Sequence, residues 1–184
     1  PVRALADLRG LELRASGSAS QILGRLGAVP VSMPMSQTPE ALQKGIVSGL
    51  FSSFEVLKDL NFAEDCRYET VTDLQVYPFA VVMNLDKYNS LPAEVKALFD
   101  SLAPEQAAWT GQYMDEHVRE ALAWAREKYQ IEVIDLPEAD AARAHELVLP
   151  LVEEWRKAAT GAGVDADAVL KDLKSLQAEY QAGG

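Results

Sequence analysis

The sequence is short of basic residues and of long apolar runs, and each shortage excludes a class of protein. Seventeen Lys and Arg stand against 28 Asp and Glu, a formal net charge of −11. Because nucleic-acid binding needs clustered basic side chains, no nucleic-acid partner is expected. No stretch approaches the roughly 18 apolar residues of a transmembrane helix, and no signal peptide is visible. The abrupt start at Pro1-Val2-Arg3 is what a fragment or a processed product would show.

Residues that carry chemistry are also scarce. Cys66 is the single cysteine, so no internal disulfide can form, and we interpret it as a half-buried packing thiol. His117 and His145 do not have the spacing of a metal-binding His pair and are expected on solvated helix faces. The sequence contains no nucleophile elbow, phosphate-binding loop or dinucleotide fingerprint. We therefore predict that the protein is not an enzyme and has no catalytic residue, metal or cofactor.

What the sequence does contain is typical of a soluble protein with a core, since 48% of its residues are hydrophobic and 24% are charged. The first half has short β-rich runs separated by helical segments, which predicts an α/β fold with a largely parallel sheet. The run Val76–Met83 is nearly all apolar, so we expect a strand buried on both faces. The strands are predicted at Leu11–Ala15, Val29–Met33, Tyr68–Thr72, Val76–Met83 and Ile131–Ile134.

From Leu91 onward the apolar residues recur with a helical period. Pro92 and Pro104 can each open a helix, and the second helix is predicted to be the longer one, ending near Tyr129. A proline inside the following helical stretch predicts a break near Leu147. The later helices are expected at Glu138–Ala158, with that break, and at Asp165–Tyr180.

The stretch from residue 27 to residue 57 predicts a strand, a polar turn and a short helix. Thr38 can act as N-cap, Pro39 fits the first helical position, and Gly45 can take the left-handed stop. Such a unit directs its loop toward the carboxyl end of the strand, where open α/β sheets bind ligands. The stretch is therefore a candidate binding site.

The same stretch carries a resemblance to a known family. The motifs are the strand Gly10-Leu11-Glu12-Leu13-Arg14, the loop Pro30-Val31-Ser32-Met33-Pro34, the segment Ala41-Leu42-Gln43-Lys44-Gly45-Ile46-Val47-Ser48-Gly49, and Met83-Asn84 followed by Leu91-Pro92. In this order they resemble the solute-binding proteins of tripartite ATP-independent periplasmic (TRAP) transporters, the DctP-like family. The sequence departs from that pattern at Ser48, where the family usually has Asp, and at Ser53-Phe54, where many members have Pro-Trp.

The resemblance implies a periplasmic-binding-protein-like fold in which two α/β lobes close around a ligand and one long helix spans both. It implies a ligand-binding lobe at residues 1–90, a crossover and the spanning helix at 91–130, and a returning strand with C-terminal helices at 131–184. The amino-terminal lobe would be missing from this chain. The implied function is periplasmic capture of an organic acid, a carboxylate, for a membrane permease. A ligand-sensing module of a signalling receptor on the same fold is the alternative.

Arg14 is the first candidate for the ligand site. It ends a predicted strand before a turn of small residues, and its planar guanidinium suits bidentate binding of a carboxylate. The family places its carboxylate-binding arginine at this position. The alternative is an arginine paired with a surface acid. Gly17, in the turn that follows, could let the backbone approach a ligand closely.

The other candidates combine short polar groups with an apolar wall. Ser52 and Ser53 could donate hydrogen bonds beside the ring of Phe54, although this ring could instead fill the core. Met35 and Ser36 follow the strand Val29–Met33, where the family often has an aromatic residue facing the cleft. A methionine there would form a more adaptable wall. Tyr77 could add an aromatic wall.

Overall fold

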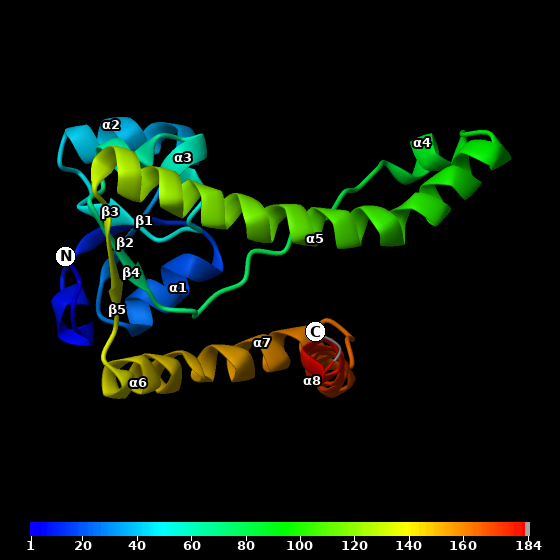
Figure 1. The fold of residues 1–184 in the computed structure, drawn as a ribbon. Coiled ribbons are helices and arrows are strands. Elements are labelled where there is room, and N and C mark those ends of the chain that lie inside the picture. Colours follow the sequence, from blue (N-terminus) through cyan, green and yellow to red (C-terminus); the bar gives the residue numbers. More distant parts are fainter. Residues whose placement is uncertain (183–184) are drawn as a thin grey trace.

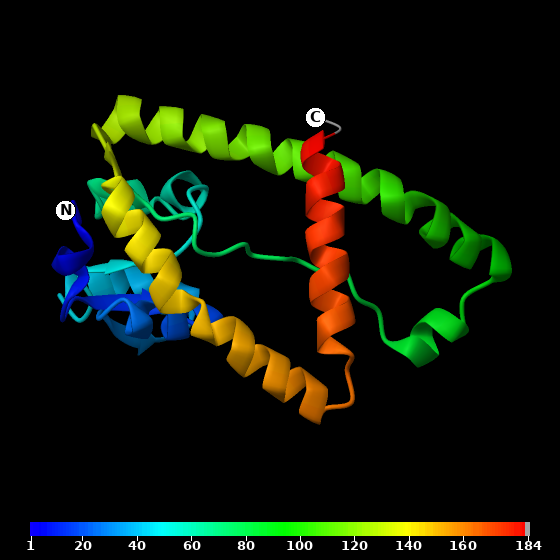
Figure 2. The same cartoon turned by 90° about the horizontal axis from the view of Figure 1, so that it is seen from below.

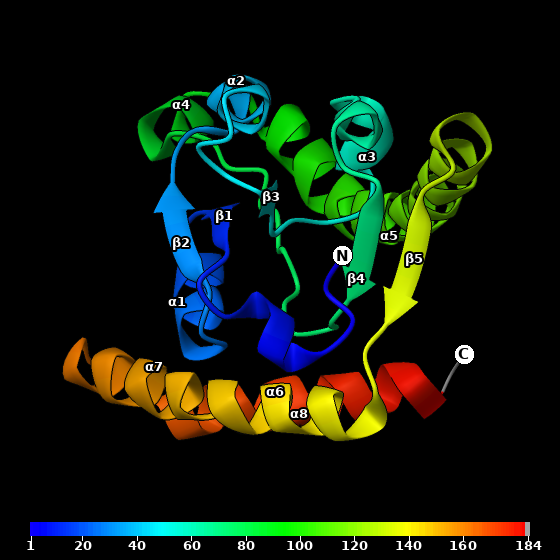
Figure 3. The ribbon, with the colours of Figure 1, turned by 90° about the vertical axis from the view of Figure 1, so that its left-hand side faces the viewer.

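Two parallel sheets form the α/β part of the chain, and the predicted fold class is confirmed. The computed structural model describes residues 1–182. The first sheet has the strand order β2-β1-β3 and the second pairs β4 with β5 (Figures 1 and 3). The strands are β1 (Glu12–Ala15), β2 (Val29–Ser32), β3 (Gly49–Leu50), β4 (Tyr68–Val71) and β5 (Glu132–Asp135). The short strand β3 was not predicted.

The register of the first sheet brings three loops together. Arg14 in the central strand lies opposite Val31 of β2 and opposite Leu50 of β3. Because all three strands are parallel, their carboxyl ends meet at one edge of the sheet. The loops that follow β1, β2 and β3 therefore start next to one another, and these loops hold most of the predicted site residues.

The helices of the α/β part are short and connect these strands. Thr38 is the first residue of its helix and not the N-cap, because Gln37 occupies that position and the Thr38 hydroxyl donates to Met35 Sδ at 3.8 Å. Gly45 has a φ of 66°, so the predicted left-handed stop is confirmed. The short helices are η1 (Leu5–Leu8), α1 (Ser18–Arg25), η2 (Met35–Gln37), α2 (Thr38–Gln43), α3 (Val56–Asp59) and η3 (Phe62–Glu64).

The segment Val76–Met83 is not a buried strand, and that prediction was wrong. It runs as extended chain from β4 to the short helix α4 (Leu85–Asn89), and no described strand pairs with it (Figure 1). The exposed fractions of Phe79 and Val82 are 89% and 85%. An apolar run is buried on both faces only where a sheet and its covering layers surround it. None of the described elements supplies that surrounding.

The helix α5 (Ala93–Tyr129) is one continuous element of 37 residues with Pro104 inside it. The expected long helix is confirmed, whereas the prediction that Pro104 opens a separate helix was wrong. A proline removes one backbone hydrogen bond and bends a helix, but good helix formers on both sides can continue it. At 1.5 Å per residue α5 is about 55 Å long, and most of it extends beyond the sheets (Figure 1).

The carboxyl end of the chain consists of α6 (Glu138–Val148), α7 (Pro150–Gly161) and α8 (Ala166–Ala182). The predicted break is confirmed and falls at Leu149, next to the proline. Figure 2 shows α7 continuing away from the sheets and α8 turning sharply away from the direction of α7, and Figure 1 shows that α8 stays at the level of α7. None of the helices formed by residues 1–182 combines the length and the apolar character that crossing a bilayer requires.

Two apolar clusters hold the α/β part together. One cluster packs α1 and α6 against β1, with Leu23 and Ala144 almost fully buried. The other packs α5 against α3 and η3, and its members include Phe62. Ala121 and Ala125 of α5 have no exposed surface, so the small side chains let the helix approach closely. The clusters hold α5 through its carboxyl-terminal part, where Ala125 and Tyr129 lie, and hold α6 through Ala144, Leu147 and Val148.

Candidate functional site

Arg14 is a buried cation held by a neutral group. Arg14 belongs to the central strand β1, and only 7% of the residue is exposed. Its Nε and Nη2 donate hydrogen bonds to the carbonyl oxygen of Met33 at 3.1 and 2.9 Å. Among the described residues no acidic side chain forms an ion pair with it. The carbonyl fixes the plane of the guanidinium without neutralising its charge. Arg14 can therefore still attract an anion.

The loop after β3 is tied directly to Arg14. The backbone N–H of Phe51 donates to the carbonyl oxygen of Arg14 at 2.9 Å, and the hydroxyl of Tyr77 approaches the Phe51 carbonyl oxygen at 3.5 Å. Burial raises the pKa of the Tyr77 phenol, the nearby Arg14 charge opposes this rise, and Glu55 adds to it. Tyr77 therefore lies within electrostatic reach of both Arg14 and Glu55.

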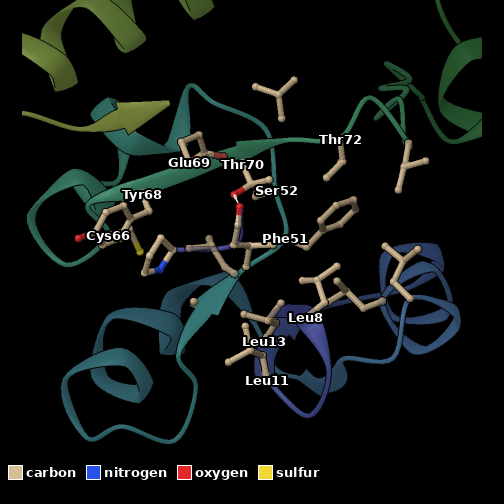
Figure 4. A pocket seen from close by; sticks show the side chains of 18 of the residues that line it. Leu8, Leu11, Leu13, Phe51, Ser52, Cys66, Tyr68, Glu69, Thr70 and Thr72 are labelled. Carbon is tan, nitrogen blue, oxygen red and sulfur yellow. Dashed lines mark hydrogen bonds between the residues drawn. The ribbon is translucent and has the colours of Figure 1, made fainter. Parts of the chain in front are cut away.

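A cavity of about 830 Å³ lies between the two sheets (Figure 4). Its apolar floor includes Leu8, Leu11 and Leu13, and residues of β4 such as Glu69 and Thr70 form the opposite wall. The edges of β3 and β4 that face this cavity have no strand partner among residues 1–182. The predicted residues that line it are Ser52, Ser53, Phe54 and Tyr77.

The other predicted residues lie outside this cavity. Adjacent side chains of a strand point to opposite faces, so Arg14 points away from the cavity that Leu13 lines. Met35 packs against the α3–α5 cluster, and Ser36 is exposed next to it. Gly17 precedes the first turn of α1 with a φ of 57°. The structure thus places four of the predicted residues at the cavity and the other four outside it, and the hydrogen bonds of Phe51 with Arg14 and Tyr77 connect the two groups.

Two buried groups of the cavity were not predicted as site residues. Burial raises the pKa of the Glu69 carboxyl to about 7, and burial raises the pKa of the Cys66 thiol to about 11. A thiol with so high a pKa carries little thiolate, which agrees with our interpretation of Cys66 as a packing residue. The sequence contained one usable signal for Glu69, its position inside the β-rich run Tyr68–Thr72 that precedes the apolar segment.

His117 does not lie on a solvated helix face, so that prediction was wrong. Its Nε2 lies 2.9 Å from both carboxylate oxygens of Asp59 in α3, and its side chain is only 16% exposed. The ring also stacks on Tyr113, which in turn stacks on Trp109. The pair with Asp59 connects α5 to α3. Within residues 1–182 no three His, Cys, Asp or Glu side chains are grouped so that they could hold a metal ion.

Residues 1–158 match the DctP family, described as bacterial extracellular solute-binding protein, family 7. The C4-dicarboxylate-binding periplasmic protein DctP of Rhodobacter capsulatus is 25% identical over 150 residues, which are 80% of this chain and 45% of that protein. The 2,3-diketo-L-gulonate-binding periplasmic protein YiaO of Escherichia coli is 28% identical over 107 residues, which are 57% of this chain and 33% of that protein. The matched stretches thus span less than half the length of these curated relatives.

Solved structures match over almost the whole chain. A TRAP periplasmic solute-binding protein from Desulfovibrio salexigens, an open complex with the C-terminus of a symmetry mate in its ligand-binding site, is 59% identical with a TM-score of 0.87. The match covers 100% of this chain and 58% of that one. A TRAP solute-binding protein from a marine metagenome, specific for aromatic acid ligands, is 28% identical with a TM-score of 0.84. This match covers 97% of this chain and 58% of that one.

Proposed function

Because this chain belongs to the DctP family of bacterial extracellular solute-binding proteins, we propose that it is the second lobe of a TRAP solute-binding protein whose ligand is an organic carboxylate. The matching proteins are solute-binding proteins of transport systems and not enzymes. The lobe captures its ligand in the periplasm, where the relatives from Rhodobacter capsulatus and Escherichia coli reside, and delivers it to a membrane permease.

Arg14 is the observation that carries the carboxylate assignment. A buried guanidinium that is oriented by a carbonyl group and forms no ion pair with an acid among residues 1–182 is a strong binding group for an anion. The loops that follow β1 and β3 bring Gly17, Ser52, Ser53 and Phe54 to the same end of the sheet. The relatives support this class of ligand, because their names specify C4-dicarboxylate, 2,3-diketo-L-gulonate and aromatic acids.

The proposed mechanism is closure of two lobes around the ligand. Residues 1–90 form one lobe, α5 within residues 91–130 extends to the other lobe, and residues 131–184 return to the first. A carboxylate held by Arg14 shifts the population toward the closed state by the difference between its affinities for the two states. The position of the α5 far end, well beyond the sheets, supports this arrangement (Figure 1).

Native mass spectrometry of the full-length protein, purified without added ligand, tests the proposal. We expect an additional mass that matches an organic acid and that disappears after denaturation and refolding. Calorimetric titration with the identified acid and with its methyl ester then tests the carboxylate itself, and the ester should bind at least tenfold more weakly. A bound neutral sugar or cation, or an ester that binds as tightly as the acid, would contradict the proposal.

A further inference from the structure

The cavity between the two sheets lies at the edges of two strands and not over one face of them. A cavity over one face of a strand touches every second residue, as it does at β1, where Leu13 lines it and its neighbours Glu12 and Arg14 do not. In the segments that carry β3 and β4 there is no such alternation, because every residue from 48 to 54 and from 65 to 75 lines the cavity. The cavity therefore opens at the edges of β3 and β4, in the plane of the strands.

Two unpaired strand edges border this cavity from opposite sides. Within residues 1–182, β3 pairs only with β1, and β4 pairs only with β5. In a parallel pair every second residue turns its N–H and C=O groups away from the partner strand, so β3 and β4 both direct backbone donors and acceptors into the cavity. Covered backbone groups are almost always hydrogen-bonded. A small ligand cannot match donors and acceptors on two facing edges, whereas an added strand matches one edge on each of its sides.

The first residues of the chain border the same cavity. Pro1, Val2 and Arg3 line it, and Figure 3 shows the amino terminus beside β4, on the side toward β3. The Thr70 hydroxyl of β4 donates to the Val2 carbonyl oxygen at 2.7 Å, and the Arg3 guanidinium donates to both carboxylate oxygens of Glu132 in β5 at 2.6 and 2.9 Å. The relatives extend well beyond the stretch that matches this chain. In a protein of that length, the residues that precede Pro1 start at the gap between β3 and β4.

We propose that the residues directly preceding Pro1 in the full-length protein form a β-strand between β3 and β4. Hydrogen bonds on both edges of this strand join the two sheets into one, with the order β2, β1, β3, inserted strand, β4, β5. The side chains of the inserted strand that point toward Leu8, Leu11 and Leu13 are apolar, so its sequence alternates. The inference rests on the proposed function only in that this chain is one lobe of a longer protein, and no ligand takes part in it.

Disulfide trapping in the full-length protein, with its own cysteines replaced by serine, tests the inserted strand. Thr70→Cys and Val71→Cys place a thiol on adjacent residues of β4, and each is combined with a single cysteine at successive positions before Pro1. Paired strands bring Cα atoms within the distance that a disulfide requires. Because alternate side chains of a strand point to opposite faces, we expect each β4 thiol to form a disulfide at alternate positions only. The two β4 thiols should select complementary sets of positions.

The other edge and a matched control complete the trapping experiment. Ser52→Cys, directly after β3, should trap the same segment as the β4 thiols do. Thr160→Cys lies exposed on α7 and should form no disulfide with it. No disulfide at either β4 thiol, or equal yields at consecutive positions, would overturn the inference, since a covering loop shows no alternation. Disulfides between two protein molecules would overturn it as well, because a second copy would then fill the gap.

Amide hydrogen exchange of the full-length protein detects the same hydrogen bonds without any substitution. We expect the amides of residues 49–52 and 68–71 to exchange as slowly as those of β1, whereas at an open edge alternate amides would exchange roughly a hundredfold faster or more. Fast exchange at either edge would overturn the inference. Neither experiment uses a ligand, so a negative result here does not contradict the organic-acid proposal, and a failed ligand test does not contradict the inserted strand.

Discussion

Arg14 lets the binding proposal be tested with one side chain. In the full-length protein, Arg14→Ala removes a buried charge-assisted contact, and we expect roughly 30-fold to several-thousand-fold weaker binding of the native acid. Arg14→Lys should restore only part of the affinity, because a point charge cannot reproduce the planar fork. Calorimetry measures both. Unchanged affinity in a folded Arg14→Ala variant would exclude Arg14 as the carboxylate-binding residue.

Glu69 predicts how the stability of this chain depends on pH. Burial raises the pKa of its carboxyl from 4.5 to about 7 in the folded state. The folded state therefore binds the proton more tightly than the unfolded state between pH 4.5 and pH 7. The contribution of Glu69 to stability is full below pH 4.5 and is lost as the pH rises through 7, by up to about 3 kcal/mol for a shift of this size.

The variant Glu69→Gln should remove this dependence. We expect the free energy of unfolding, measured in urea at pH 5 and pH 8, to decrease less between the two values than it does in the parent protein. The exposed control Glu127→Gln should behave as the parent does. An equal decrease in the parent and in Glu69→Gln would show that the Glu69 carboxyl titrates near its ordinary pKa.

At the residue level, the sequence predicted properties that follow from the type of a side chain. It could not predict properties that follow from the burial of that side chain. Arg14 could be singled out because a guanidinium at the end of a strand before small residues suits an anion. Glu69 could not, because a glutamate on the surface and a glutamate that the fold buries look the same in a sequence. The raised pKa of its carboxyl depends on how much of the side chain the fold covers.

Among the elements, Pro104 in α5 gives a separate prediction. Proline has no N–H, so the carbonyl group of Asp100 loses its donor, and an interior proline is about 3 kcal/mol less favourable than alanine. Pro104→Ala should therefore increase the free energy of unfolding by about 1 to 3 kcal/mol. Urea unfolding followed by circular dichroism measures the change, and Glu105→Ala at the next position should have an effect close to zero. A loss of stability would show that the bend itself is needed for packing.

The elements that were predicted wrongly have a common physical cause. The period-2 and apolar patterns predicted strands correctly where the partners lie within this chain, as for β1, β2, β4 and β5. The apolar run Val76–Met83 predicted a buried strand, but residues 1–182 supply neither a strand partner nor an apolar cover for it. For Pro104 the local signal for a helix start was present, but the helix-forming residues before it continued the preceding helix. A single sequence cannot tell these outcomes apart, because both depend on what packs against the segment.

The whole molecule has an asymmetric shape with an uncovered apolar surface. α5 and the α6–α7 pair leave the sheets on opposite sides and extend in the same direction, with residues 72–84 between them (Figure 1). The side chains of α5 in this region are exposed although they are large and apolar, with Trp109 57% exposed. The exposed apolar residues of α5 are Leu98, Phe99, Leu102, Trp109 and Tyr113. Contiguous apolar surface of this kind usually marks an interface.

We predict that the amino-terminal half of the full-length protein covers this surface of α5. Produced separately, that half should bind this chain in analytical ultracentrifugation, because the relatives are about twice as long and the exposed side chains of α5 lie on the part that extends away from the sheets. The double variant Leu98→Lys with Trp109→Lys should weaken the association at least tenfold, since two charges would be buried without partners. Ala107→Lys adds the same charge on the other side of the helix and should have little effect. If the double variant associates as well as the parent chain, the interface lies elsewhere, and α5 does not connect the two lobes through these side chains.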